Sequence, residues 1–277
     1  AVSTYINRYA VKLGSSAVVF TNNDSAYMAA LDLVKSGVHV SAVVDPRPEP
    51  SGTLPTLVRQ SGIPIWGDSV LVDVRGGKSV SAVDVMQLDF TRKAVNGKRR
   101  RLECDLLAVS GGWNPAIHLH SQSGGRPKYD SDRACFLPGP SVQAERSIGS
   151  CNGTFHLRGC LEDGIRAGSS AAHAAGFGDG KPSEDTIYCD AETEEPLHTM
   201  WLVPSPKPPE RSAKQFVDFQ TDTSASDIII ATNEGYESIE HVKRYTTLGM
   251  GNDQGKIGNV NGIGILAWVL GKDLSSV

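Results

Sequence analysis

The chain has 277 residues, of which 39% are hydrophobic and 21% are charged, and its formal net charge at pH 7 is −4. This composition is typical of a globular protein with room for about two domains, and it disfavours the disordered and fibrous classes. The negative charge argues against nucleic acid as a partner, because phosphate binding needs an excess of Lys and Arg. We interpret the one dense basic run, KRRR at residues 98–101, as a solvated hairpin end rather than a phosphate patch.

No apolar run reaches the roughly eighteen residues that span a bilayer, so we expect no membrane partner. The N-terminal residues lack the pattern of a secretory signal peptide. The five cysteines are odd in number, widely spaced and never in a C-x-x-C motif, which disfavours a disulfide framework and a zinc site. We therefore expect a reducing, cytoplasmic location.

The clearest pattern lies in residues 16–46, where an apolar run, a polar turn, an Ala-rich segment of helical periodicity and a second apolar run follow one another. This order predicts a βαβ unit whose helix ends at Gly37. Asp45 closes the second strand, where dinucleotide-binding folds carry the acid that binds a ribose hydroxyl. However, NNDSAY at residues 22–27 replaces the glycine fingerprint of such folds, and Asp24 would repel a pyrophosphate. We therefore interpret this unit as architectural rather than as a working nucleotide site.

Alternating apolar residues between Gly and Asn turns at 63–105 predict antiparallel hairpins that form a flap. Residues 104–115 (CDLLAVSGGWNP) predict a buried strand that runs into a Gly-Gly turn. Residues 147–153 (SIGSCNG), followed by an amphipathic segment at about 155–175, predict a strand, a glycine turn and a helix N-terminus. Such a helix start can bind an anion, but a purely structural turn explains the pattern equally well.

Residues 181–214 contain four prolines in WLVPSPKPPERSAK and predict an extended linker. Short helices are expected after it. The first opens with a capping box, Ser224-x-x-Asp227. The second ends at Gly249, and a third covers about residues 263–270.

Several stretches carry a more specific resemblance: NRYAVKLG, VVFTNNDSAYMAALDL, GWNPAIHLHSQSGG, GSCNGTFHL, FVDFQTDTSASDI and EHVKRYTTLGMGNDQGK. With them, the chain resembles an internal portion of the alpha subunit of heterotetrameric sarcosine oxidase. The resemblance implies an α/β fold: the second half of a two-dinucleotide, glutathione-reductase-like flavoprotein fold with an antiparallel flap. A small, mostly helical domain like bacterioferritin-associated ferredoxin follows it.

The same resemblance implies domain boundaries. A pyridine-nucleotide-disulfide-oxidoreductase-like domain would cover residues 1–190, with an inserted NAD-domain-like half at about 14–108 and a return to the first half at about 109–190. Residues 191–214 would form a linker, and residues 215–277 the small helical domain without a cluster.

The resemblance also implies an activity, namely a flavin-dependent oxidase of the EC 1.5.3 type. Such a complex converts sarcosine to glycine, formaldehyde or methylene-tetrahydrofolate, and hydrogen peroxide. Its partners would be beta, gamma and delta subunits, with FAD on the beta subunit, FMN at the alpha–beta interface, and NAD held mostly upstream of this chain. We identify no catalytic residue and expect the isolated chain to be inactive. Two alternatives stay open: a subunit of a related amino-acid or opine dehydrogenase, and a non-catalytic scaffold subunit.

For NAD, the resemblance points to Ser150, Phe155 and Leu157, with Gly149 and Gly153 shaping the turn. Ser150 stands where related flavoproteins carry an acid, so we do not expect FAD on this chain. For FMN, two cations, two hydroxyls and a glycine-rich turn suit a phosphate clamp. The candidates are Arg244, Thr246, Thr247, Gln254 and Lys256. The alternative is that the cations only complement the dipole at a solvated helix end.

Related ferredoxin-like modules hold a [2Fe–2S] cluster with four cysteines. Alignment places Asp218, Gln220, Asp253 and Gly258 at those four positions. Because such clusters are held by Cys sulfur, we expect no iron–sulfur cluster and no other metal in this domain.

Overall fold

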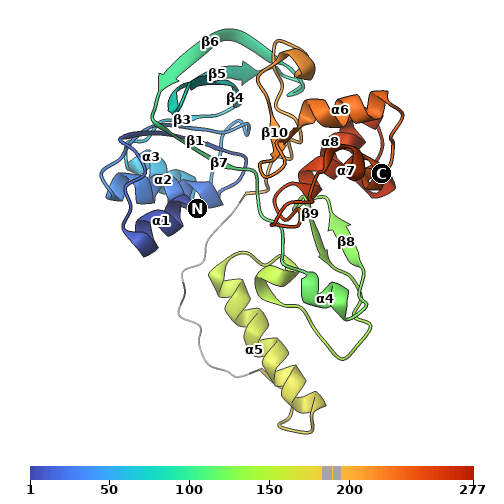
Figure 1. Ribbon diagram of the computed structural model, residues 1–277. Helices are drawn as coiled ribbons and strands as arrows, with labels where there is room; N and C mark the ends of the chain where they lie inside the picture. Colours follow the sequence, from blue (N-terminus) through green and yellow to red (C-terminus); the bar gives the residue numbers. More distant parts are fainter. Residues whose placement is uncertain (183–188, 190–194) are drawn as a thin grey trace. The chain divides into compact units, whose positions relative to one another are not determined.

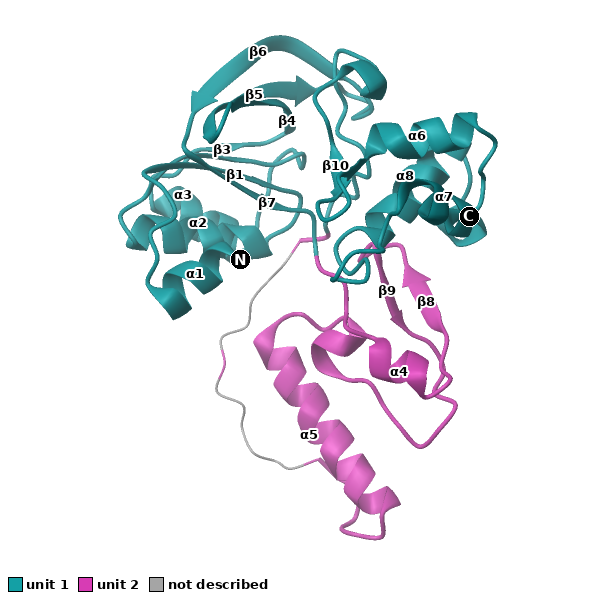
Figure 2. Ribbon diagram, in the orientation of Figure 1, with its two compact units in different colours: residues 1–112, 197–277 teal, residues 113–196 magenta. Residues whose placement is uncertain are grey.

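The computed structural model describes residues 1–182, 189 and 195–277, which fall into two compact units (Figure 2). The first unit combines residues 1–112 with residues 197–277, and the second covers residues 113–196. The chain is of mixed α/β class. No helix in the described ranges is long and apolar enough to cross a membrane.

A four-stranded parallel sheet with the order β3-β2-β1-β7 lies at the start of the first unit (Figure 1). Gly37, at a φ of 78°, follows the end of the helix that links the two central strands. The predicted βαβ unit is therefore confirmed. The elements of this part are α1 (Val2–Tyr9), β1 (Ser16–Thr21), α2 (Ser25–Lys35), β2 (His39–Val44), α3 (Thr53–Gln60), β3 (Ile65–Trp66) and β7 (Leu106–Ser110).

Both faces of β1 and β2 are largely buried, which explains why these two central strands are almost continuously apolar. Successive side chains of a strand point to opposite faces. Ala17 and Val19 of β1 accordingly pack in one cluster with α2 and α3, whereas Val18 packs in a second cluster with the flap. In Figure 1 the helices lie on one side of the sheet and the flap on the other.

The flap is a three-stranded antiparallel sheet of β4 (Ser69–Gly76), β5 (Val80–Leu88) and β6 (Val95–Glu103), as the turn signals predicted. Two details differ from expectation. The basic run at 98–101 lies inside β6 and not at a hairpin end. The strand β7 is not fully buried, because it is the edge of its sheet and Val109 is 65% exposed.

The C-terminal part of the first unit packs three helices around a cluster that includes Ile228, Val242 and Leu266. The predicted capping box is present, with Ser224 and Asp227 bonded to each other's backbone. The second helix ends at Thr246, earlier than expected, because Thr247 already adopts a left-handed φ of 61°. The third begins at Asn259, four residues before the predicted start. The elements are η2 (Pro209–Arg211), β10 (Phe216–Asp218), β11 (Thr223–Ser224), α6 (Ala225–Asn233), α7 (Ile239–Thr246), α8 (Asn259–Leu270) and η3 (Leu274–Ser276).

The second unit contains one long helix, one short helix and one hairpin. No strand precedes the turn at 149–153, so the predicted strand–turn–helix order is wrong there, and a 3-10 turn takes its place. None of the four apolar clusters among the described residues includes a residue of this unit. Its elements are α4 (His118–Gln122), β8 (Pro127–Asp130), β9 (Cys135–Pro138), η1 (Gly149–Asn152) and α5 (Leu157–Ala174).

The predicted linker at 191–214 begins with residues 191–194, and these lie outside the described residues, as does residue 190 at the predicted domain end. In the described part, 195–214, the regular structure is the short η2 turn.

Candidate functional site

The turn expected to contact NAD depends on two glycines. Gly149 and Gly153 adopt φ values of 59° and 81°, in the left-handed region that favours glycine. A Cβ at Gly153 would come within 2.8 Å of the Leu137 side chain. Between them the η1 turn closes with hydrogen bonds from Gly153 N–H to the Ser150 carbonyl and from Thr154 N–H to the Gly149 carbonyl. The two glycines are therefore required for the conformation of the turn, whether or not a ligand binds there.

The start of α5 is already occupied by the chain's own polar groups. The His156 ring caps the helix by accepting a hydrogen bond from Gly159 N–H, at 3.0 Å. The Asp163 carboxylate accepts from the Thr154 hydroxyl at 2.9 Å and from Gly149 N–H. The Thr154 bond is the main cause of the lowered pKa of Asp163, so a negative charge lies at this helix start. That charge disfavours a pyrophosphate at the turn.

The side chains predicted to contact NAD differ in exposure. Ser150 is exposed and Leu157 is 63% exposed, whereas Phe155 is half-buried. The Ser150 hydroxyl lies 3.8 Å from the Cys160 sulfur. A hydroxyl and apolar surface at this turn suit the ribose or ring of a nucleotide better than its phosphates.

A buried charge network fills the carboxyl ends of β1 and β2, where a dinucleotide fold receives its cofactor. Asp45, fully buried, accepts a 2.8 Å hydrogen bond from the Tyr27 hydroxyl and a 2.8 Å hydrogen bond from the Arg47 guanidinium. The same guanidinium contacts Asp24 at 2.7 Å. The acid at the position where dinucleotide folds bind a ribose therefore binds protein groups, in agreement with the architectural interpretation of this unit.

The shifted pKa values of Tyr27 and Arg47 agree with a network in which each group is held by its partners. Burial, followed by the charge and hydrogen bond of Asp45, raises the pKa of Tyr27 far above its usual value. Burial alone would lower the pKa of Arg47, but its bonds to Asp45 and Asp24 outweigh this and raise it. Tyr27 thus stays neutral and Arg47 stays charged at neutral pH. Sequence reasoning noticed Asp45 and Asp24 but missed Arg47, although a cation two residues after the acid was a readable signal.

The four positions aligned with cluster cysteines meet in space. The Asp218 carboxylate accepts from Gly249 N–H at 2.8 Å and from Gln220 N–H at 2.9 Å. Gln220 Oε1 accepts from Asp253 N–H at 3.4 Å, and a Cβ at Gly258 would lie 3.4 Å from the Asp218 Cβ. These side chains thus hold the 249–257 loop through its own backbone. Burial would raise the pKa of Asp218, but the Gly249 and Gln220 N–H groups outweigh burial and lower it.

In the described structure, the one side-chain hydrogen bond among the five residues expected to bind FMN joins the neighbours Thr246 and Thr247. The Thr246 hydroxyl donates to the Val242 carbonyl, the Thr247 hydroxyl to the Thr246 carbonyl, and the Gln254 amide to the Gly251 carbonyl. Arg244 and Lys256 are exposed, and within the part of the chain that the structure describes Arg244 forms a 3.8 Å ion pair with Glu240. The two cations therefore remain available, whereas the hydroxyls and the amide are engaged locally.

The hollow beside Thr246 does not suit a phosphate. It has a volume of about 350 Å³ and is lined by Thr221, Asp222, Thr223, Asp227, Ile230, Tyr245 and Thr246. The lining includes two carboxylates and no Lys or Arg, so an anion would be repelled there. A phosphate clamp centred on Thr246 is thus disfavoured.

Residues 212–277 match the family described as the Sarcosine oxidase A3 domain. Nearly the whole chain is similar to curated alpha subunits of sarcosine oxidase, at 40% identity over 275 residues in Corynebacterium sp. (strain P-1) and 34% over 270 residues in Rhizobium meliloti (strain 1021). The chain is homologous to sarcosine oxidase alpha subunits. The two alignments cover 98% and 96% of this chain but only 28% and 25% of the sarcosine oxidase relatives.

The fold is also found in a solved oxidoreductase. The L-proline dehydrogenase from P. horikoshii aligns with a TM-score of 0.60 at 17% identity, over 99% of this chain and 48% of that one. At this identity the likeness concerns the fold alone. This shared fold agrees with the mixed α/β architecture described above.

Proposed function

We propose that this chain acts as part of the alpha subunit of a heterotetrameric sarcosine oxidase and supports its NAD site and its FMN-containing interface. The observation that carries the proposal is 40% identity to such a subunit over 98% of the chain. The complex would demethylate sarcosine to glycine, formaldehyde or methylene-tetrahydrofolate, and hydrogen peroxide. The partners would be beta, gamma and delta subunits, in the cytoplasm. The homology does not favour the opine or amino-acid dehydrogenase alternative.

The bound flavins, FAD on the beta subunit and FMN at the interface, would supply the redox chemistry of the complex. The role of this chain is binding and positioning. Its βαβ unit serves as scaffold, because the Tyr27–Asp45–Arg47–Asp24 network fills its nucleotide end. The domain boundaries implied by the resemblance, 1–190, 191–214 and 215–277, remain part of this proposal.

Toward NAD, the turn at 149–157 fits only part of the cofactor. Ser150 and Leu157 are exposed and Phe155 is half-buried, so they offer a hydroxyl and apolar surface to a ribose or a ring. Gly149 N–H and the α5 start are already bonded to Asp163 and His156. We therefore assign the pyrophosphate to other parts of the alpha subunit.

Toward FMN, the exposed cations Arg244 and Lys256 fit the charge of a phosphate. Thr246, Thr247 and Gln254 fit less well, because their side chains bond to nearby carbonyls. The interface role is therefore proposed for the two cations first. The small C-terminal domain is proposed to be ferredoxin-like without a cluster, since Asp218 and Gln220 bond to the loop where cysteines would hold iron.

The second unit has features of a segment that is completed by other polypeptide. None of its described residues belongs to an apolar cluster, and Leu119, Leu157 and Phe177 are each more than 60% exposed. A segment without an apolar cluster of its own needs other polypeptide to bury its apolar side chains. We propose that the remainder of the alpha subunit covers it.

A segment exchange tests the proposal. This chain replaces the matching quarter of the Corynebacterium strain P-1 alpha subunit, which is then co-produced with its beta, gamma and delta subunits. We expect a chimera that retains NAD and consumes oxygen when sarcosine is added. A chimera that assembles with its partners but shows no sarcosine-dependent oxygen uptake would overturn the proposal.

The cation assignment is tested in the same chimera. Lys256→Ala should lower the FMN content, whereas Lys272→Ala, which removes a surface ion pair with Glu237, should leave it unchanged. Equal FMN content in all three proteins would contradict an interface role for Lys256.

A further inference from the structure

The basic run inside β6 divides its charges between two faces of the flap. Side chains at alternate positions of a strand point to opposite faces. Arg99 and Arg101 contact the buried Asp84 at 3.4 and 3.0 Å, and Arg75 reaches the same carboxylate at 2.9 Å. Burial would raise the pKa of Asp84, but the hydrogen bonds from Arg101 and Arg75 outweigh it and lower the pKa. The cations on this face are therefore all engaged in ion pairs with Asp84.

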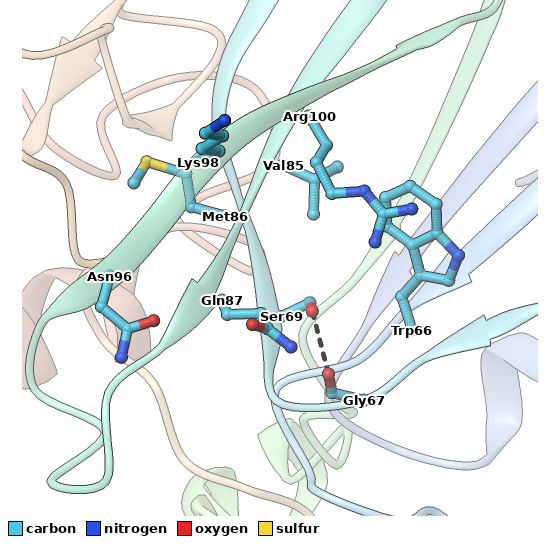
Figure 3. A pocket seen from close by; sticks show the side chains of 9 residues that line it. All are labelled: Trp66, Gly67, Ser69, Val85, Met86, Gln87, Asn96, Lys98 and Arg100. Atoms are coloured by element: carbon cyan, nitrogen blue, oxygen red, sulfur yellow. Dashed lines mark hydrogen bonds between the residues drawn. The ribbon is translucent and has the colours of Figure 1, made fainter.

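On the other face, Lys98 and Arg100 line a groove of about 360 Å³ that contains no carboxylate (Figure 3). Neither cation has an ion pair within the described ranges of the chain. The strand register brings the other polar residues of the groove together. Asn96 of β6 lies opposite Gln87 of β5, and Gln87 lies opposite Ser69 of β4. The lining residues are Trp66, Gly67, Ser69, Val85, Met86, Gln87, Asn96, Lys98 and Arg100.

The Arg100 guanidinium is held in place by an aromatic ring. Its Cζ lies 4.1 Å from the centroid of the Trp66 ring, and Figure 3 shows the two side chains against each other. A stacked guanidinium keeps its in-plane N–H donors free for a carboxylate or a phosphate. The backbone of Trp66 is held in β3, where Trp66 pairs with Val44 and its carbonyl accepts a 3.0 Å hydrogen bond from Asp45 N–H.

We propose that this groove binds a small dianion, either a phosphate monoester or a dicarboxylate. Arg100 supplies a planar pair of donors, Lys98 supplies a second positive charge, and the Asn96 and Gln87 amides supply neutral donors. The volume lies at the lower end of the range of small-molecule sites, about 300–1,000 Å³. Because the groove lies on the flap, the proposal is independent of the NAD and FMN assignments.

Titration calorimetry of the 277-residue chain at low ionic strength, with inorganic phosphate and separately with succinate, tests the proposal. Arg100→Gln and Lys98→Gln should each weaken binding about tenfold, since a charge-assisted hydrogen bond contributes about 1.5 kcal/mol. Arg99→Gln is the matched control, with the same charge change on the same strand but the opposite face, and should change affinity less than about twofold. Far-UV circular dichroism and the thermal midpoint establish that each variant is folded.

Tighter binding of phosphate would identify the phosphate monoester as the ligand class, and tighter binding of succinate the dicarboxylate. The proposal is overturned if the folded wild-type chain shows no saturable heat with either probe. It is also overturned if Arg99→Gln weakens binding as much as Arg100→Gln, because that result would reflect net charge and not the groove.

Discussion

Replacing Arg47 by Met tests the network that closes the nucleotide end of the βαβ unit. The guanidinium makes three contacts with Asp45, at 2.8, 3.1 and 3.2 Å, and one with Asp24, at 2.7 Å. Without it, two buried carboxylates would lose their cation, although Asp45 would keep the Tyr27 hydroxyl and the residue-47 N–H as donors. Removing one partner of a buried ion pair costs about 3–5 kcal/mol, because the remaining charge is uncompensated.

Urea-induced unfolding followed by tryptophan fluorescence measures this loss. With an m-value of about 2 kcal/mol/M, the midpoint should fall by about 1.5–2.5 M. Arg92→Met is the control, since Arg92 makes a partly exposed 3.0 Å pair with Asp68 and its loss should cost at most about 1 kcal/mol.

The double variant Asp45→Asn, Arg47→Met should lose less free energy of unfolding than the two single variants lose in sum. The reason is that both charges of the pair are removed together. If Arg47→Met stays within about 1 kcal/mol of wild type, the network does not stabilise the fold, and the argument that it replaces a bound nucleotide fails.

Three further predictions concern other parts of the chain. The pKa of Asp84 in the folded state lies below its ordinary 3.8. The charged Asp84 therefore stabilises the fold above that pH, and this contribution should fade as the pH drops below about 4. In thermal melts at a series of pH values, Asp84→Asn should reduce the fall of the melting temperature on the acid side. Gly153→Ala should destabilise by about 1–3 kcal/mol because of its positive φ and the 2.8 Å contact, whereas Gly164→Ala, in an open position of α5, should be neutral or stabilising in the same melts. Ser224→Ala should cost about 1 kcal/mol in urea unfolding by removing the capping box, and an unchanged midpoint would contradict the cap assignment.

The sequence by itself determined the features that depend on neighbouring residues. The βαβ unit at 16–46, the flap hairpins and the Ser224–Asp227 capping box were all predictable, because periodicity, turn residues and caps act within a few positions of one another. The degenerate turn at 22–27 was also readable, since the glycines that a phosphate needs are missing.

Only the tertiary structure decided which charges meet. The contact of Arg47 with Asp24 spans 23 positions and depends on two strands lying side by side in the sheet. The 98–101 run divides into cations that pair with Asp84 and cations that line the groove. This division required the register that places Arg101 opposite Asp84 and Arg100 opposite Val85. Likewise, Asp218 meets Gly249 only because three helices pack around one apolar cluster. Long-range pairing depends on how elements pack, and that information is not contained in local sequence patterns.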